Sequence, residues 1–157
     1  FEKLPAKMNG IFDLVVCLAN SISGVDTSAD LRKSLQSFSR VLRPGGHLVL
    51  QMLNYSAIKE SEVMPIRVTE NDGIVYARYS IRRGSRLSLH VVRIDLTGKQ
   101  PQFEPFCHEF GNFTPERVNS ALASVGFENL RRYGDLSLAT RFKRSSRDLV
   151  LVGKKGR

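Results

Sequence analysis

Two short polar segments each follow an apolar stretch, and their residue types could hold a ligand. Ala19, Asn20 and Ser21 follow the apolar residues 11–18, and Asn54 and Tyr55 follow residues 48–53. An asparagine side chain offers a donor and an acceptor, and a tyrosine can stack or donate a hydrogen bond. The alternative is that Asn20 and Ser21 only cap a turn, as such residues often do. The residues alone leave both interpretations open.

Other side chains could move a proton or hold an anion. Tyr55, His108 and Glu109 are candidate general bases, which a reaction needs when its acceptor group is protonated. Arg78, Arg82 and Arg93 are candidates for binding an anionic substrate, and Arg78 is the one that we assign to the site. The ordinary alternatives are a packing histidine and a solvated arginine on a sheet face. The two cysteines and three histidines lack the spacing of metal ligands, so we expect no metal site.

The elements that position the first segments have the pattern of a parallel strand pair. Residues 11–18 and 48–53 are almost continuously apolar, which is typical of strands covered on both faces. Between them, Thr27 is a predicted N-cap, and apolar residues then recur at helical spacing up to Leu42. Pro44, Gly45 and Gly46 predict the helix end and a turn. The helix makes the connection long enough for parallel strands.

The pattern changes after Tyr55. Four strand-like segments, at residues 66–69, 74–81, 87–96 and 103–110, are separated by turns at 71–73, 83–85 and 97–98, which predicts an antiparallel meander over residues 63–111. A second helix starts at the predicted N-cap Thr114 and ends before Gly126. Strands are expected at 130–136 and 149–152. We therefore expect one α/β domain over residues 1–157 with an inserted meander.

Charge and hydropathy restrict the class of partner. The formal net charge is +9, and residues 131–157 hold nine basic and two acidic residues. This excess indicates either a solvated rim or a surface for RNA, and we favour the rim because no RNA-binding aromatic motif accompanies it. No apolar run is long enough to cross a bilayer, so we expect no membrane partner. No leader is evident and the cysteines are few, so we expect a cytoplasmic protein.

In this order the motifs resemble class I S-adenosylmethionine-dependent methyltransferases. The pieces are Cys-Leu-Ala-Asn-Ser at 17–21, Leu-Arg-Pro-Gly-Gly at 42–46, Thr-Pro-Glu at 114–116, Tyr-Gly-Asp at 133–135 and the closing Arg-Asp-Leu-Val-Leu-Val-Gly. They are similar to strands four to seven of that fold, and are closest to enzymes like glycine N-methyltransferase. The start, Phe1 to Pro5, is similar to the segment after strand three. The resemblance implies an α/β, partial Rossmann-like sheet, incomplete at its N-terminus.

The resemblance also implies roles for particular residues. Leu18, Ala19, Asn20 and Ser21 would lie beside the methionine and sulfonium part of S-adenosylmethionine, and Asn54 and Tyr55 near the substrate. The meander would be a lid on the substrate side. Taken alone, the strand at 11–18 would be an edge with exposed apolar faces, and the isolated chain would bind the cofactor poorly.

Three departures from the family pattern narrow the expectation. The glycine-rich loop after strand one and the acidic residue after strand two are absent from this chain. Ala19 stands where the family usually has a glycine, and Leu53 stands where the glycine-methylating enzymes have an arginine that binds the substrate carboxylate. We therefore expect transfer of a methyl group to a small molecule other than glycine, as part of a longer chain. A non-catalytic Rossmann-like binding module, including one that binds RNA, is the alternative. A homo-oligomer is an open expectation.

Overall fold

The structure is a computed structural model that describes residues 4–84, 86–111 and 113–157. The chain divides into two compact units, one formed by Phe1–Ala57 with Phe113–Arg157 and the other by Ile58–Asn112. The predicted turn at residues 83–85 includes Ser85, and the segment Phe1 to Pro5, which resembles the family's segment after strand three, includes residues 1–3. Both segments therefore lie partly outside the described residues.

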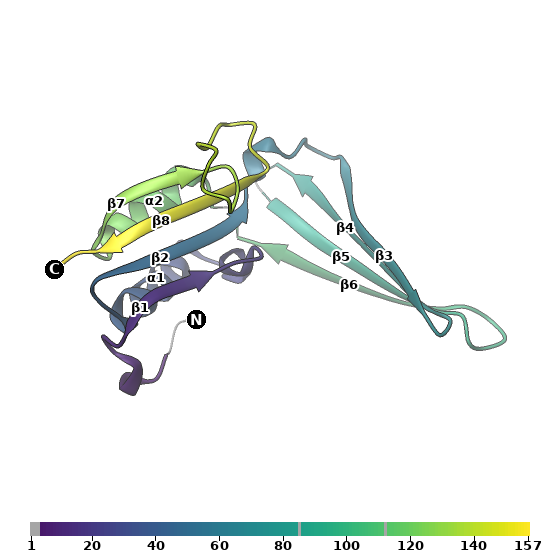
Figure 1. Ribbon diagram of the computed structural model, residues 1–157. Coiled ribbons are helices and arrows are strands. Elements are labelled where there is room, and N and C mark those ends of the chain that lie inside the picture. Colours follow the sequence, from purple (N-terminus) through teal and green to yellow (C-terminus); the bar gives the residue numbers. More distant parts are fainter. Residues whose placement is uncertain (1–3, 85, 112) are drawn as a thin grey trace. The chain divides into compact units, whose positions relative to one another are not determined.

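The first unit is a four-stranded sheet with two helices on one face (Figure 1). The strand order is β1 (Phe12–Cys17), β2 (Leu42–Leu53), β8 (Asp148–Lys155) and β7 (Phe127–Tyr133). β1 and β2 are parallel, whereas β8 runs antiparallel to both of its neighbours. This is the predicted α/β sheet, with the last strand of the chain, β8, between β2 and β7.

Helix α1 (Ser28–Val41) and helix α2 (Pro115–Ser124) begin where their caps predict. The hydroxyl of Thr27 accepts a hydrogen bond from the Asp30 amide at 3.1 Å, and that of Thr114 accepts one from the Arg117 amide at 3.3 Å. Each bond satisfies an amide that the first helical turn leaves without a partner. Both predicted N-caps are confirmed.

The helices cover one face of the sheet and leave the other open. On β2, Leu48, Leu50 and Met52 are buried, and the core continues into the two helices and β8. Leu14 and Val16 of β1 pair with His47 and Val49, so they lie on the opposite face, and they are 51% and 56% exposed. β1 is an edge strand, as the family resemblance implies, and the expectation of cover on both faces fails for it within this chain.

Two predicted boundaries are corrected. α1 ends at Val41, as Pro44 predicts, but β2 already begins at Leu42, so the turn at Gly45, with φ of +80°, lies within β2 as an irregularity in its pairing with β1. Strand β7 spans 127–133, not 130–136. Gly126, at φ +88°, turns the chain directly into the strand, and the hydrogen bond from the Ser137 amide to Asp135 forms a turn after it.

The second unit is a four-stranded antiparallel meander. Its strands are β3 (Val63–Asn71), β4 (Ile74–Arg83), β5 (Arg86–Asp95) and β6 (Gln102–Phe110), in sequential order. Asp72 and Gly73 both have positive φ, 50° and 76°, which is the geometry of the tight hairpin that Asn-Asp-Gly predicts. The predicted meander is confirmed.

Candidate functional site

The candidate site lies at the carboxyl ends of the parallel strands β1 and β2. Ala19 and Asn20 follow β1 in the left-handed region, with φ of 55° and 61°. Asparagine tolerates this conformation better than most residues, whereas alanine is strained there. The chain therefore turns sharply at once after β1, and the Asn20 side chain is brought over the end of β2.

Asn20 links the two strand ends through its side chain. Its Oδ1 accepts hydrogen bonds from the Leu53 amide and the Ser23 hydroxyl, both at 3.0 Å. Its Nδ2 donates to the Tyr55 hydroxyl at 3.0 Å. Ser23 and Tyr55 are buried. The amide of Asn20 is thus a structural bridge between the two segments that the sequence singled out.

Tyr55 is held in this bridge in its neutral form. Burial raises the pKa of its phenol above the usual value, and the hydrogen bonds with Ser23 and Asn20 only partly offset that effect. A phenol with a raised pKa stays protonated at neutral pH and is a weak base there. The geometry therefore gives Tyr55 a hydrogen-bonding role at the strand ends.

Gln51 is a site residue that the sequence reasoning missed. Its Oε1 accepts a hydrogen bond from the Asn20 amide at 3.3 Å, and its Nε2 donates to Asp148 at 2.8 Å. It therefore ties the turn after β1 to the start of β8. A polar glutamine within the apolar run 48–53 was the signal that could have identified it.

The other predicted residues of the first unit divide into exposed and internal groups. Leu18, Ala19 and Ser21 are exposed, and the Ser21 hydroxyl donates to the Leu18 carbonyl at 2.7 Å. Asn54 is buried, and its Nδ2 donates to the carbonyls of Arg144 and Ser146 at 2.9 and 2.8 Å. Asn54 thus fastens the loop before β8, while the predicted substrate contact stays a prediction.

His108 and Arg78 lie in the second unit, on the same face of the meander. Arg78 pairs with Val91 and through it with Phe106, whereas His108 pairs with Leu89. The His108 ring packs edge-on against Phe110, with 5.0 Å between the ring centroids. Arg78 is exposed and lies directly across from Arg67 of β3.

Two hollows of the first unit lie away from the predicted site residues. One of 680 Å³ is lined by Pro44, Gly45, Glu128 and Lys154 among others, at the amino end of β2. A second, of 490 Å³, is lined by Arg131, Arg132, Tyr133 and Arg141. Neither includes a predicted site residue. We base the candidate site on the hydrogen-bonded bridge, because ligands of parallel sheets bind outside the carboxyl ends of the strands.

Sequence comparison finds relatives among N-methyltransferases. The chain is 27% identical, over 151 residues, to a glycine/sarcosine N-methyltransferase of Halorhodospira halochloris; the match covers 85% of this chain and 48% of that protein. No family model matches the chain. The chain spans about half the length of the curated relatives it matches.

Solved structures show the same fold. An S-adenosylmethionine-dependent methyltransferase from Clostridium acetobutylicum matches with a TM-score of 0.77 and 18% identity, covering 99% of this chain and 62% of that one. CalS10, an amino pentose methyltransferase from Micromonospora echinaspora solved with S-adenosylmethionine bound, matches with a TM-score of 0.70 and 22% identity, covering 92% and 58%. The chain therefore has the Rossmann-like fold of class I methyltransferases, and the predicted resemblance is confirmed.

Proposed function

We propose that this chain is the substrate-side part of an S-adenosylmethionine-dependent methyltransferase that methylates a small-molecule amine as part of a longer polypeptide. The observation that carries the proposal is the Asn20 bridge, which brings both predicted polar segments together at the carboxyl ends of β1 and β2. Two similar proteins support an amine as the methyl acceptor. One is named a glycine/sarcosine N-methyltransferase and the other an amino pentose methyltransferase, and each of these substrates carries an amino group.

The exposed residues of the turn fit the methionine end of the cofactor. Leu18 is 37% exposed and Ala19 and Ser21 are exposed, so their surfaces are free to flank a ligand at the end of β1. The Asn20 side chain is committed to Ser23, Leu53 and Tyr55, so its role is to hold the turn in place. S-adenosylmethionine, when bound, would supply an electrophilic methyl group.

The chain's own contribution to the reaction is to position groups. Methyl transfer from a sulfonium requires the donor, the methyl carbon and the acceptor in line, and orientation supplies most of the acceleration. Neutral Tyr55, fixed by Asn20, would hold the two strand ends at a constant spacing. A protonated amine would need a base, and His108 is the residue we propose for that step.

Arg78 is the residue we propose for an anionic group of the substrate. Arg67 lies directly across from it, on the same face of the sheet. Two like charges opposite each other destabilise a sheet unless an anion lies between them. By contrast, the neighbouring Arg93 is paired with Asp95 at 2.8 Å and Glu104 at 3.5 Å. The meander, with this arginine pair, is our candidate for the substrate-side lid.

Further expectations belong to the same proposal. We place the protein in the cytoplasm, an assignment that the free thiols of Cys17 and Cys107 support. None of the helices in the described part of the chain is long and apolar enough to span a membrane. We also propose that the protein forms a homo-oligomer.

The test is methyl transfer by the longest natural polypeptide that carries this chain. Mass spectrometry would follow the methylation of sarcosine, amino sugars and other small amines in the presence of S-adenosylmethionine. We expect methylation of at least one amine, with a higher KM in Arg78→Ala and an unchanged KM in Arg83→Ala. A protein that binds S-adenosylmethionine and methylates only oxygen or carbon acceptors would refute the amine class. A protein that does neither would favour the non-catalytic alternative.

A further inference from the structure

Two adjoining hollows lie along β7, the edge strand opposite β1 in the first sheet. One has a volume of 490 Å³ and the other 410 Å³, and Arg131 and Tyr133 line both of them. We call the two together the arginine hollow. The first part adds Arg132 and Arg141, and the second part adds His47 and Lys154. Neither part is lined by an aspartate or a glutamate among the described residues.

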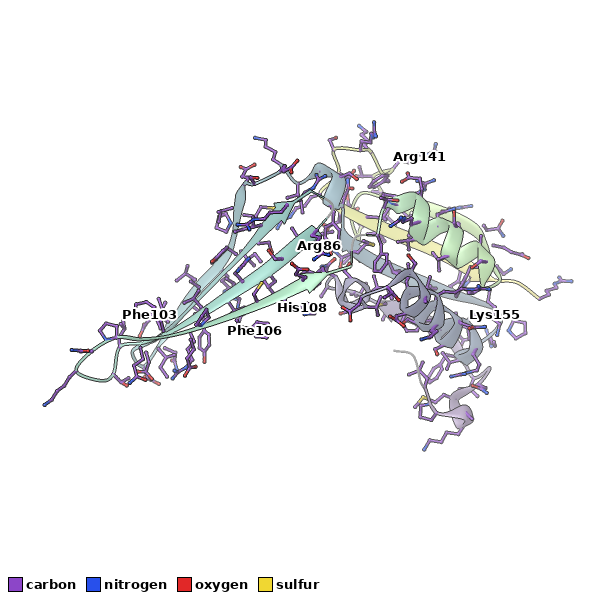
Figure 2. All side chains as sticks on the ribbon, turned by 180° about the vertical axis from the view of Figure 1, so that it is seen from behind. Arg86, Phe103, Phe106, His108, Arg141 and Lys155 are labelled. Atoms are coloured by element: carbon purple, nitrogen blue, oxygen red, sulfur yellow. The ribbon has the colours of Figure 1, made fainter. Side chains whose placement is uncertain are left out.

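Main-chain pairing sets the position of Arg141 in this hollow. Hydrogen bonds of 3.2 and 2.9 Å join residues 140–142 to residues 132–134 at the end of β7. The resulting antiparallel bridge places Arg141 directly across from Tyr133. Figure 2 shows Arg141 at this end of the sheet, whereas Lys155 lies at the other end. The segment that carries Arg141 is therefore held against the strand that carries the other two arginines.

An irregularity in β7 sets the position of Arg131. The register between β7 and β8 shifts between Glu128 and Arg131, and Asn129 inside the shift has a φ of 53°. Bulges of this kind redirect the side chains that follow them. Glu128 pairs with Lys154 before the shift, and Arg131 pairs with Val152 after it. Because Val152 and Lys154 are two residues apart on one strand, Arg131 and Lys154 belong to the same face of the sheet.

Basic residues predominate around the arginine hollow. Residues 131–147 hold six basic residues and one acidic residue, Asp135. The Asp135 carboxylate accepts hydrogen bonds from the amide and the hydroxyl of Ser137, so it is engaged within its own turn. A local surplus of positive charge in a hollow raises the concentration of anions there.

The guanidinium groups of the hollow have few carboxylate partners. Arg132 lies 3.4 Å from Glu116, and the two side chains are 38% and 72% exposed, so this pair contributes little. In the part of the chain that the structure describes, no ion pair includes Arg131 or Arg141. Guanidinium forks bind the oxygens of a phosphate in pairs. The hollow therefore offers groups that suit phosphate.

We propose that the arginine hollow binds a small ligand through a diphosphate group. Each part of the hollow supplies two basic side chains of its own, Arg132 and Arg141 in one and His47 and Lys154 in the other. Arg131 lines both parts, so it would contact both phosphates. This inference does not depend on the proposed activity, since β2 and β8 separate β7 from the β1 end of the candidate site.

The size of the hollow favours a small ligand over the phosphates of an RNA chain. Each part has a volume within the range of small-molecule sites, about 300–1,000 Å³. An RNA surface combines a longer basic stripe with exposed aromatic side chains on which bases stack. Tyr133 lines both parts but is only partly exposed.

The experiment is calorimetric titration of inorganic pyrophosphate into the longest natural polypeptide that carries this chain, at about 0.15 M salt. Arg141→Ala is the test, and it should raise the dissociation constant by at least about tenfold, because a charge-assisted pair of hydrogen bonds is lost. Arg144→Ala is the matched control. Arg144 is exposed on the same loop but lines neither part of the hollow, so its loss should raise the constant by about twofold or less.

A conservative variant and a second ligand make the test specific. Arg141→Lys keeps the charge and loses the planar fork, so it should still raise the dissociation constant by about threefold or more. A single-stranded oligonucleotide should bind no more tightly than pyrophosphate. Because these titrations contain neither S-adenosylmethionine nor an amine, their outcome is separate from that of the methylation assay.

Three results would overturn the proposal. The first is absence of pyrophosphate binding by a folded protein. The second is equal weakening by Arg141→Ala and Arg144→Ala, which would mean diffuse attraction by surface charge. The third is tighter binding of the oligonucleotide, weakened equally by both variants, which would assign the basic segment to nucleic acid instead.

Discussion

Replacing Asn20 with alanine should loosen the ends of both parallel strands. The change removes the acceptor for the Leu53 amide and the buried Ser23 hydroxyl, and the donor to the Tyr55 hydroxyl. Unsatisfied buried groups cost about 1–3 kcal/mol each, and some of them will rehydrate, so we expect a total loss of about 3 kcal/mol. Ser21→Ala is the control, because its hydrogen bond to the Leu18 carbonyl is exposed and its loss should cost about 0.5 kcal/mol or less.

The thiol of Cys17 provides a local assay for this loss. The chain has two cysteines, and a Cys107→Ser background leaves only Cys17, which is buried at the end of β1. Its labelling rate by a thiol reagent then reports opening of the first unit. A loss of 3 kcal/mol should speed labelling about a hundredfold.

A double-mutant cycle isolates the contact between Asn20 and Tyr55. Tyr55→Phe alone should cost about 1 kcal/mol, and Asn20→Ala combined with Tyr55→Phe should cost about 1 kcal/mol less than the sum of the single changes. Labelling of the Asn20→Ala variant no faster than that of Ser21→Ala, or strictly additive effects in the cycle, would refute the bridge.

Three further changes test other parts of the structure. Gly153→Ala should cost about 1–3 kcal/mol in urea unfolding, because its Cβ would lie 2.8 Å from a side-chain carbon of β7, whereas Gly24→Ala meets no atom within 4 Å and should be neutral. Burial raises the pKa of Tyr55 in the folded state, so its contribution to stability is fully present below the unfolded pKa of about 10 and is lost as the pH rises toward the folded pKa. Tyr55→Phe should therefore flatten the alkaline limb of a curve of unfolding free energy against pH. NMR titration should give Asp95 a pKa of about 2, lowered mainly by the hydrogen bond from the Thr97 hydroxyl, and Thr97→Val should raise this pKa. An ordinary pKa of Asp95 in the wild type would contradict the observed hydrogen bonds.

Most of the architecture was predictable because local signals agreed with the tertiary structure. The caps Thr27 and Thr114, the Asn-Asp-Gly hairpin and the apolar period of the strands each predicted an element that the structure confirms. The boundary at Pro44 was predicted less well. A Pro-Gly-Gly motif normally ends regular structure, but here the pairing with β1 resumes on both sides of it, at Leu42 and at His47, so the motif forms an irregularity within β2 instead of a separate turn.

The candidate site was predictable in its location but not in its bonding. The polar residues that follow the apolar strands identified Asn20 and Tyr55. Nothing in the sequence showed, however, that the Asn20 side chain donates a hydrogen bond to the Tyr55 hydroxyl. The role of Gln51 depends on β2 and β8 lying side by side, which a 97-residue separation conceals. The pairing of Arg67 with Arg78 likewise follows from a register that a bulge shifts.

The most direct test of the central claim is calorimetric titration of S-adenosylhomocysteine into the longest natural polypeptide that carries this chain. The account predicts binding at one site per chain, weakened by at least about tenfold in Leu18→Arg, because the exposed side chain at the end of β1 would flank the ligand. Arg83→Ala, in the meander, should bind like the wild type. Absence of binding in a folded wild-type protein, or equal binding by the Leu18→Arg variant, would contradict the account.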